Sequence, residues 1–233
     1  MLSEFSFVVF ALLFAFAFVV WTVIGLMYNE VNWGAWWVNA VDGWFRWFAR
    51  VYHRLRGERI QLPESGGVLL VSNHLSGLDP FLLIAMCNRP LRFLIAEEEY
   101  NRFGLKWMFK AAGCIPVDRG GRTDAAFRAA VRALKSGEVV ALFPHGRIYP
   151  DDQTEARVKP GVLRLAQLSG CAIVPVRVQG IGAVGTVVKS VFKRSHANIT
   201  NLPQISVEQS QHHDMRQQLG ELLLGRRLEI SVD

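Results

Sequence analysis

The chain has 233 residues, a length that argues against an array of large domains and suits one domain with a sizeable core. Its formal net charge of +6 excludes an acidic protein and fits nucleic acid, anionic lipid or a phosphate-bearing substrate as partner, or an ordinary basic surface. Cys87, Cys114 and Cys171 lie far apart in apolar stretches without C-x-x-C pairing, which favours reduced, buried thiols over disulfides or metal ligands.

Residues 5–28 form an apolar run without a charged side chain, bounded by Glu4 and Glu30. As an α-helix the run would be about 36 Å long, which exceeds a hydrocarbon core of ~30 Å. A cleaved signal peptide is disfavoured because the run is too long, no Lys or Arg precedes it and no A-x-A site follows. We therefore predict a transmembrane or membrane-embedded helix over residues 1–30, and a membrane rather than nucleic acid as the partner. The alternatives of a true span and a hairpin in one leaflet stay open.

Basic residues follow the apolar run and do not precede it. They are Arg46, Arg50, Arg54, Arg56 and Arg59. Under the positive-inside rule, this asymmetry predicts an inner or cytoplasmic membrane protein whose main body faces the cytoplasm.

Residues 31–61 are rich in aromatic side chains at spacings of three and four, which predicts an amphipathic helix. Five of the chain's seven Trp lie here, at positions 33, 36, 37, 44 and 47. Trp interleaved with Arg is typical of the lipid headgroup boundary, so we predict an interfacial helix that lays the following domain onto the bilayer. A helix that covers a soluble core is the alternative.

A turn-rich segment at Leu62–Gly67 opens the third predicted region, a globular domain over residues 62–233. Predicted strands and helices alternate along it, which predicts an α/β fold: a layered, mainly parallel sheet flanked by helices, with functional groups at the carboxyl ends of the strands. The predicted strands are Val68–Ser72, Arg92–Ala96, Cys114–Val117, Val139–Phe143 and Ala172–Val178. The predicted helices are Pro80–Cys87, Tyr100–Ala112, Thr123–Lys135, Pro160–Ser169 and Asp214–Leu224. Lys189–Gln211 is predicted as loop with one late strand at most.

A histidine and an aspartate stand five residues apart where the first of these strands gives way to a helix. Pro80 suits the first helical turn, which makes Asp79 the expected N-cap. A loop through Ser76 and Gly77 can fold Asp79 back so that one carboxylate oxygen caps the helix and the other holds His74. Such a pair can activate a hydroxyl group, because the imidazole takes the proton and the carboxylate stabilises the imidazolium. A helix cap beside an incidental histidine is the alternative.

Three further blocks follow this N-H-x-x-x-x-D block, each at a predicted strand or strand end. They are G-C-I-P-V-D-R at 113–119, L-F-P-H-G-R-I at 142–148 and I-V-P-V at 173–176. Together the four blocks resemble those of the glycerolipid acyltransferase family, whose best-known members are the 1-acylglycerol-3-phosphate acyltransferases. The likeness covers roughly residues 66–180, and the order and spacing of the blocks make it specific.

The resemblance implies a membrane-bound acyltransferase with 62–233 as its catalytic domain. His74 would deprotonate the hydroxyl of a lysophospholipid, with 1-acylglycerol-3-phosphate as the expected acceptor in phospholipid biosynthesis. The hydroxyl would attack the thioester of acyl-CoA or acyl carrier protein, and Asp79 would orient the base. Transfer from thioester to ester requires no metal or other cofactor.

The resemblance also places the acceptor's phosphate among Arg119, His145, Gly146 and Arg147. Arginine suits this role because its planar fork donates two hydrogen bonds to phosphate oxygens, although either arginine could be an ordinary surface charge. The family usually reads F-P-E-G in this block, whereas His145 stands here in place of the glutamate, and a neutral imidazole carries no negative charge. The acceptor headgroup therefore stays open, and a catalytically silent membrane lipid-binding protein remains the second interpretation.

Three other features resemble binding motifs. The turn at Gly120–Thr123 opens a helix, where a plain helix cap is the preferred interpretation and a site for a phosphate of coenzyme A or of a headgroup is the alternative. The G-x-G-x-x-G pattern at Gly180–Gly185 lacks the acidic residue expected ~20 positions on and comes too late for a dinucleotide-binding domain. His212 and His213 are adjacent, so their side chains point apart and do not suggest a metal site.

Overall fold

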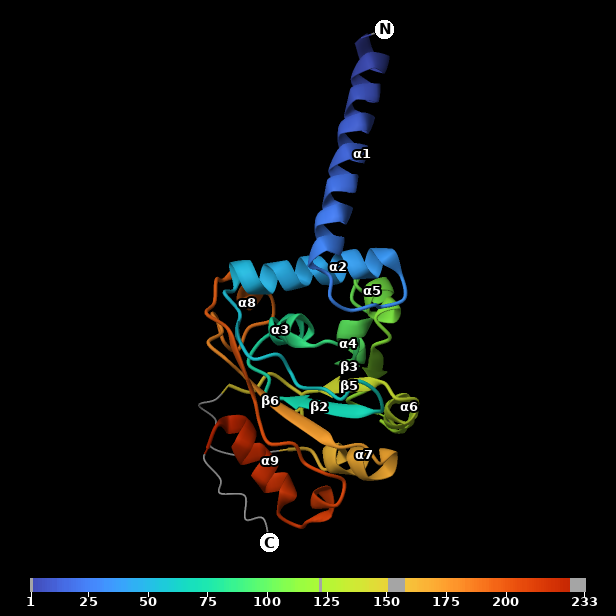
Figure 1. The fold of residues 1–233 in the computed structure, drawn as a ribbon. Coiled ribbons are helices and arrows are strands. Elements are labelled where there is room, and N and C mark those ends of the chain that lie inside the picture. The colour runs from blue at the N-terminus through green and yellow to red at the C-terminus, as the bar shows by residue number, and fades with distance from the viewer. Residues whose placement is uncertain (1, 122, 151–157, 227–233) are drawn as a thin grey trace.

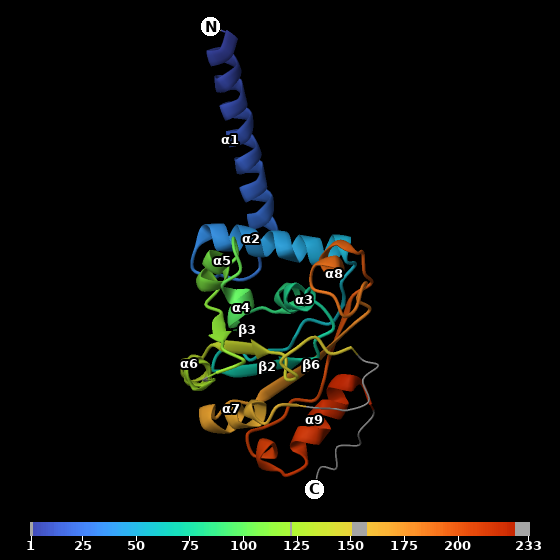
Figure 2. The same ribbon diagram turned by 180° about the vertical axis from the view of Figure 1, so that it is seen from behind.

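The computed structural model describes residues 2–121, 123–150 and 158–226. Arg122 of the turn at Gly120–Thr123, and residues 151–157 and 227–233 of the predicted globular domain, lie outside the described residues. Helix α1 (Leu2–Tyr28) projects from the body, and α2 (Trp36–Trp47) runs across its base (Figures 1 and 2). Beyond α2, a layer of short helices, a sheet and a second helical layer follow in order.

The central sheet confirms the predicted α/β fold. Its seven strands among the described residues lie in the order β1-β7-β6-β2-β5-β3-β4, and every pairing except the antiparallel β6–β7 pair is parallel. The strands are β1 Arg56–Gly57, β2 Val68–Ser72, β3 Leu91–Ala96, β4 Ile115–Val117, β5 Val139–Leu142, β6 Ile173–Gln179 and β7 Asn198–Asn201.

Alternate residues of the strands build a core on each face of the sheet. On β2, Leu70 faces the side covered by α3 (Asp79–Met86), whereas Leu69 faces the side covered by α6 (Asp124–Lys135), α7 (Gly161–Ser169) and α9 (Met215–Leu224). All five residues of β2 are buried, so β2 reads as a continuous apolar run, as expected for a parallel strand covered on both faces. The three cysteines are buried and free, as predicted.

Helices α1 and α2 cross at two glycines. A Cβ on Gly43 would overlap the backbone of Gly25, and one on Gly25 would overlap the carbonyl oxygen of Ala40. The indole of Trp44 stacks on that of Trp21 and donates a hydrogen bond to the Trp21 carbonyl oxygen at 2.9 Å. Because glycines stand at the crossing, the two backbones lie in contact. Trp44, one of the aromatic residues of α2, consequently packs against α1 rather than facing lipid.

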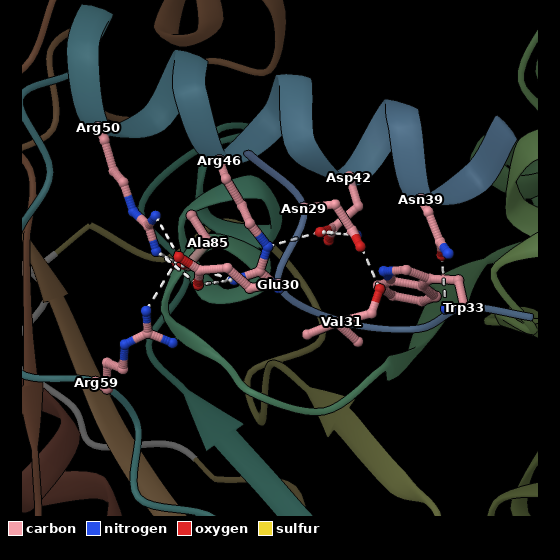
Figure 3. Close-up of polar contacts among 10 residues, drawn as sticks. All are labelled: Asn29, Glu30, Val31, Trp33, Asn39, Asp42, Arg46, Arg50, Arg59 and Ala85. Atoms are coloured by element: carbon pink, nitrogen blue, oxygen red, sulfur yellow. Dashed lines mark hydrogen bonds and ion pairs between the residues drawn. The ribbon is translucent and has the colours of Figure 1, made fainter. Parts of the chain in front are cut away.

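A partly buried ion-pair network fastens this junction to the body (Figure 3). The side chain of Arg46 is 1% exposed; it donates to Asp42 at 2.6 Å and to Glu30 at 3.0 Å. Arg50 donates to both carboxylate oxygens of Glu30, at 2.6 and 2.9 Å. Both guanidinium groups also donate to the Ala85 carbonyl oxygen in the last turn of α3, where positive charge is favoured. Arg46 and Arg50, expected at the headgroup boundary, therefore point into the protein.

Glu30 is the point where the network joins three segments. Arg59, which lies between β1 and β2, pairs with Glu30 at 3.0 Å. The pKa of Glu30 is lowered to about 2, chiefly by the hydrogen bond from Arg50. Asn29 extends the network, because its amide donates to Asp42 at 2.9 Å and to the Val31 carbonyl oxygen at 2.8 Å (Figure 3).

Two predicted helices differ from the structure. The predicted helix Tyr100–Ala112 is two short helices, α4 (Glu97–Tyr100) and α5 (Lys106–Ala111), because Gly104 breaks it in the left-handed region at φ 80°. The predicted helix over 31–61 is shorter: α2 continues as a π-helix through Phe48–Tyr52. Residues 56–57 then form the edge strand β1, since their backbone pairs with β7.

Candidate active site

The candidate site lies at the carboxyl ends of neighbouring parallel strands. His74 follows β2, the block at 142–148 begins at the end of β5, and Arg119 follows β4. Strands β2, β5, β3 and β4 are consecutive in the sheet and parallel, so these segments emerge at the same edge. This edge is where α/β sheets carry their functional groups.

His74 and Asp79 meet as predicted. Nδ1 of His74 lies 2.9 Å from Oδ2 of Asp79, and their side chains are 17% and 0% exposed. Because a carboxylate oxygen only accepts, Nδ1 carries the hydrogen and Nε2 is left as the basic atom. The pair therefore presents a base at the surface, backed by a buried negative charge.

The prediction that Asp79 also caps the helix is wrong. Leu78 occupies the N-cap position of α3, and no side chain caps the helix. Asp79 is the first helical residue, and its carboxylate turns back toward the loop. Oδ2 accepts hydrogen bonds from the backbone N–H groups of Leu75 at 2.6 Å and Ser76 at 2.9 Å, and Oδ1 accepts from the Ser76 hydroxyl at 3.0 Å. The carboxylate of Asp79 thus holds both the backbone of the loop and the imidazole of His74.

The ring of Phe143, to which the sequence assigns no role, packs against His74. The ring of Phe143 stacks on His74 with centroids 3.9 Å apart and planes 12° apart, and Phe93 stacks behind Phe143 at 6.2 Å. Phe143 belongs to the third block, directly after β5, and β5 pairs with β2. The contact could have been predicted from the sequence, because Phe143 and His74 follow two strands that were both predicted for a parallel sheet.

The residue directly after the third block contacts the loop of His74 through its backbone. The N–H of Tyr149 donates to the carbonyl oxygen of His74 at 2.6 Å. The ring of His145 is buried and stacks on the Tyr149 ring with centroids 4.4 Å apart. The guanidinium of Arg147 lies 5.9 Å from the centroid of the same ring. His145 therefore fills space under the loop, and Arg147 is exposed beside it.

Gly146 has a backbone conformation that favours glycine, and it lies under the side chain of Lys159. Its φ is 72°, and a Cβ there would lie 2.5 Å from Nζ of Lys159. The backbone N–H of Lys159 also donates to the Pro144 carbonyl oxygen at 3.1 Å. Lys159 is thus a basic side chain of the site that the sequence reasoning missed, because it lies 13 residues after Gly146 and outside the four blocks.

Arg119 lies at the same sheet edge but is paired. Its guanidinium lies 3.7 Å from a carboxylate oxygen of Glu98, which follows β3, and both side chains are about half exposed. The pairing with Glu98 was not predicted. A phosphate would have to compete with this exposed ion pair, which is weak in water.

Asn73 ties the loop of His74 to β6, and a glycine-rich turn follows β6. The Asn73 amide donates to the Val178 carbonyl oxygen at 2.9 Å and accepts from the Val178 N–H at 2.7 Å, as a strand backbone would. Gly180 has φ 72°, and a Cβ there would overlap the His196 carbonyl oxygen. The Gly180–Gly185 pattern is therefore a tight turn packed against a neighbouring segment.

Among the described residues, no group of three or more His, Cys, Asp or Glu side chains could hold a metal ion.

A partly exposed imidazole backed by a buried carboxylate at the edge of a parallel sheet is suited to group transfer from an activated donor to a hydroxyl group. The sequence profile of the family described as Acyltransferase matches residues 54–179. Because the match spans more than half of the chain, the protein belongs to this acyltransferase family, which confirms the resemblance seen in the four blocks.

Several bacterial and plant proteins are similar to this chain. A 1-acyl-sn-glycerol-3-phosphate acyltransferase of Bacillus subtilis (strain 168) is 24% identical over 120 residues, covering 51% of this chain and 59% of that protein. A probable enzyme of the same name from Mycoplasma genitalium is 31% identical over 137 residues, covering 55% and 49%. An N-acylphosphatidylethanolamine synthase of Arabidopsis thaliana is 29% identical over 113 residues, covering 44% and 40%. The matches thus cover about half the length of these relatives.

The fold is also similar to a solved structure. The crystal structure of the 1-acyl-sn-glycerophosphate (LPA) acyltransferase PlsC from Thermotoga maritima superposes with a TM-score of 0.61. The two chains are 16% identical, and the superposition covers 82% of this chain and 78% of that one. This likeness supports the fold.

Proposed function

We propose that the protein is a membrane-bound O-acyltransferase that transfers a fatty acyl group from acyl-CoA or acyl carrier protein to a lysophospholipid in phospholipid biosynthesis. The expected acceptor is 1-acylglycerol-3-phosphate, the substrate class in the names of the Bacillus and Mycoplasma relatives. The observation that carries the proposal is the 2.9 Å contact between His74 Nδ1 and the buried Asp79 carboxylate, which leaves Nε2 as the base.

In the proposed reaction, Nε2 of His74 accepts the proton of the acceptor hydroxyl as its oxygen attacks the thioester carbonyl carbon. The tetrahedral intermediate then collapses, so that the C–S bond breaks and an ester C–O bond remains. The imidazolium returns the proton to the departing thiolate. Asp79 stabilises the imidazolium between these steps, because its negative charge lies beside Nδ1–H in a buried setting.

The acceptor's phosphate would bind beside the third block. Arg147 is exposed next to the catalytic loop, and the ammonium group of Lys159 lies over Gly146. We assign phosphate binding to these two cations first. Arg119 would join them on leaving Glu98, and His145 would shape the pocket from below rather than touch the phosphate.

The acceptor and product of such a reaction are lipids, so membrane attachment belongs to the proposal. The described part of α1 from Ser6 to Tyr28 is long and apolar enough to cross a membrane, and none of its most apolar window is buried in the protein. We propose that α1 anchors the catalytic domain to the cytoplasmic face, as the arginines after it suggest. Helix α2 would lie at the headgroup level.

The direct test compares the wild-type protein with His74→Ala in lipid vesicles. The assay would supply acyl-CoA or acyl carrier protein thioester and 1-acylglycerol-3-phosphate. We expect the variant to lose acyl transfer by about 10²–10⁴-fold or more while it stays bound to vesicles. Equal rates in the two proteins would overturn the proposed base and favour a catalytically silent lipid-binding protein.

The Arabidopsis relative and His145 both raise the question of which acceptor the protein uses. The name of that relative describes an acyl transfer to the amine of phosphatidylethanolamine. A panel of lysophosphatidic acid, lysophosphatidylethanolamine and phosphatidylethanolamine separates the two chemistries. An ester product with the first acceptor supports the main proposal, whereas an N-acyl product would support the second.

A further inference from the structure

The short helix α8 (Val188–Phe192) and the residues beside it carry an exposed surface that mixes apolar and basic side chains. Val187, Val188 and Phe192 are 46%, 55% and 71% exposed. The exposed basic side chains of the segment are Lys189, Lys193 and Arg194. Apolar side chains interleaved with Lys and Arg fit the boundary of an anionic bilayer, where the former enter the acyl region and the latter meet headgroups.

This surface is fastened to the end of the helix that crosses the base of α1. The Tyr52 hydroxyl donates to the Phe192 carbonyl oxygen at 2.5 Å, and the His53 imidazole Nε2 donates to the Val191 carbonyl oxygen at 3.0 Å. In both views α8 lies directly beneath the end of α2, on the side of the sheet from which α1 projects (Figures 1 and 2). A membrane that contains α1 would therefore approach α8.

The same segment touches the loop that carries the base. The N–H of Gly185 donates to the Leu75 carbonyl oxygen at 2.8 Å, and the N–H of Gly77 donates to the Thr186 carbonyl oxygen at 3.1 Å. A Cβ at Gly77 would overlap the carbonyl oxygen of Val187, so the two backbones are in contact. A position of α8 in the bilayer would thus set the position of the catalytic loop.

We propose that the α8 surface, defined by Val187, Val188, Lys189, Phe192, Lys193 and Arg194, is a second bilayer-docking site that binds anionic membranes beside the active site. Phe192 and the two valines enter the headgroup boundary, and the basic side chains hold anionic lipids. The inference rests on the proposed membrane placement of α1 and on no particular acceptor. It gives the acceptor a short path, since the loop of His74 lies against the docked segment.

Site-specific fluorescence in vesicles tests the proposal. The full chain, with Phe192→Cys carrying an environment-sensitive fluorophore, is reconstituted into phosphatidylcholine vesicles with phosphatidylglycerol and a lipid that carries a doxyl quencher. The native cysteines are buried, so labelling goes to the introduced thiol. Phe14→Cys on α1 is the control for the anchor, and Gln211→Cys, exposed near α9 at the opposite end of the molecule, is the control for the far face.

We expect strong quenching at positions 14 and 192, none at 211, and a marked loss of quenching at 192 when Lys189→Glu and Lys193→Glu are combined. Quenching at 14 without quenching at 192 would overturn the docking site and leave the proposed function intact. Absence of quenching at both positions would overturn the docking site together with the membrane placement. A third outcome is that the labelled Phe192→Cys variant shows no quenching while the unlabelled variant forms a disulfide between two copies. This outcome would assign the surface to a second copy of the chain and overturn the proposal.

Discussion

The rings of His74 and Phe143 lie parallel, with their centroids 3.9 Å apart, so the proposed base has two fixed supports. Asp79 fixes Nδ1 in the plane of the imidazole, and Phe143 covers one face of it. Rotation about the Cβ–Cγ bond would break both contacts. Nε2 therefore keeps one direction, which is the condition for efficient proton transfer to a bound hydroxyl.

Phe143→Leu should slow acyl transfer by about two- to tenfold with little change in KM, because an aromatic pair contributes about 0.5–1.5 kcal/mol. Phe143→Tyr keeps the ring and should retain wild-type turnover. The measurement is kcat and KM for both variants with saturating donor. Equal turnover in the two variants would show that the ring does not orient the base.

Asp79→Asn should lower kcat by about 10²–10⁴-fold, because the amide cannot stabilise the imidazolium. Ser76→Ala is the matched control, since it removes the hydroxyl contact to Oδ1 of Asp79 and leaves the carboxylate beside His74. The control should retain most of its turnover. If both variants lost activity equally, the role of Asp79 would be to hold the loop rather than to assist the base.

Arg46→Met should destabilise the protein by about 3–5 kcal/mol, because it leaves the buried Asp42 carboxylate without its cation. Combining it with Asp42→Leu removes both charges and should recover most of the loss. The midpoint of unfolding in detergent, followed by circular dichroism, measures both. A double variant no more stable than Arg46→Met would contradict the view that the uncompensated charge causes the loss.

Acid should weaken the junction of α1 and α2 through Glu30. Its folded-state pKa of about 2 lies below the ordinary value of 4.5, so its contribution is fully present above pH 4.5 and is lost as the pH falls toward 2. Glu30→Gln should be less stable than wild type at neutral pH, and the difference should shrink through this window. Unfolding midpoints of both proteins across the pH range test this, and a constant difference would argue against the assignment.

The predicted strands were close to the observed ones because a buried parallel strand is apolar on both faces. Val68–Ser72 was predicted with its observed bounds for this reason. The edge strand Arg56–Gly57 and the helix α8 were missed, since each is short and exposed and gives no periodic signal. Arg46 was expected at the surface, because its burial depends on Asp42 and Glu30 arriving from separate segments.

The candidate site was predictable where its members are close in sequence. His74 and Asp79 share one loop, so their contact followed from a single turn. The role of Asp79 inside that turn did not follow, because a carboxylate before a helical proline ordinarily caps the helix. Lys159 contacts Gly146, and Glu98 contacts Arg119, because of the order and register of neighbouring strands. The sequence alone does not predict that order or register.

The crossing of α1 and α2 at Gly25 and Gly43, together with the charges around Glu30, packs α1 directly against the body of the protein. In the proposed membrane placement, this packing sets the height of His74 above the lipid plane. In a membrane, such an enzyme would meet its acceptors by lateral diffusion in two dimensions. Its encounter rate would depend on the fluidity and surface density of lipids rather than on their bulk concentration.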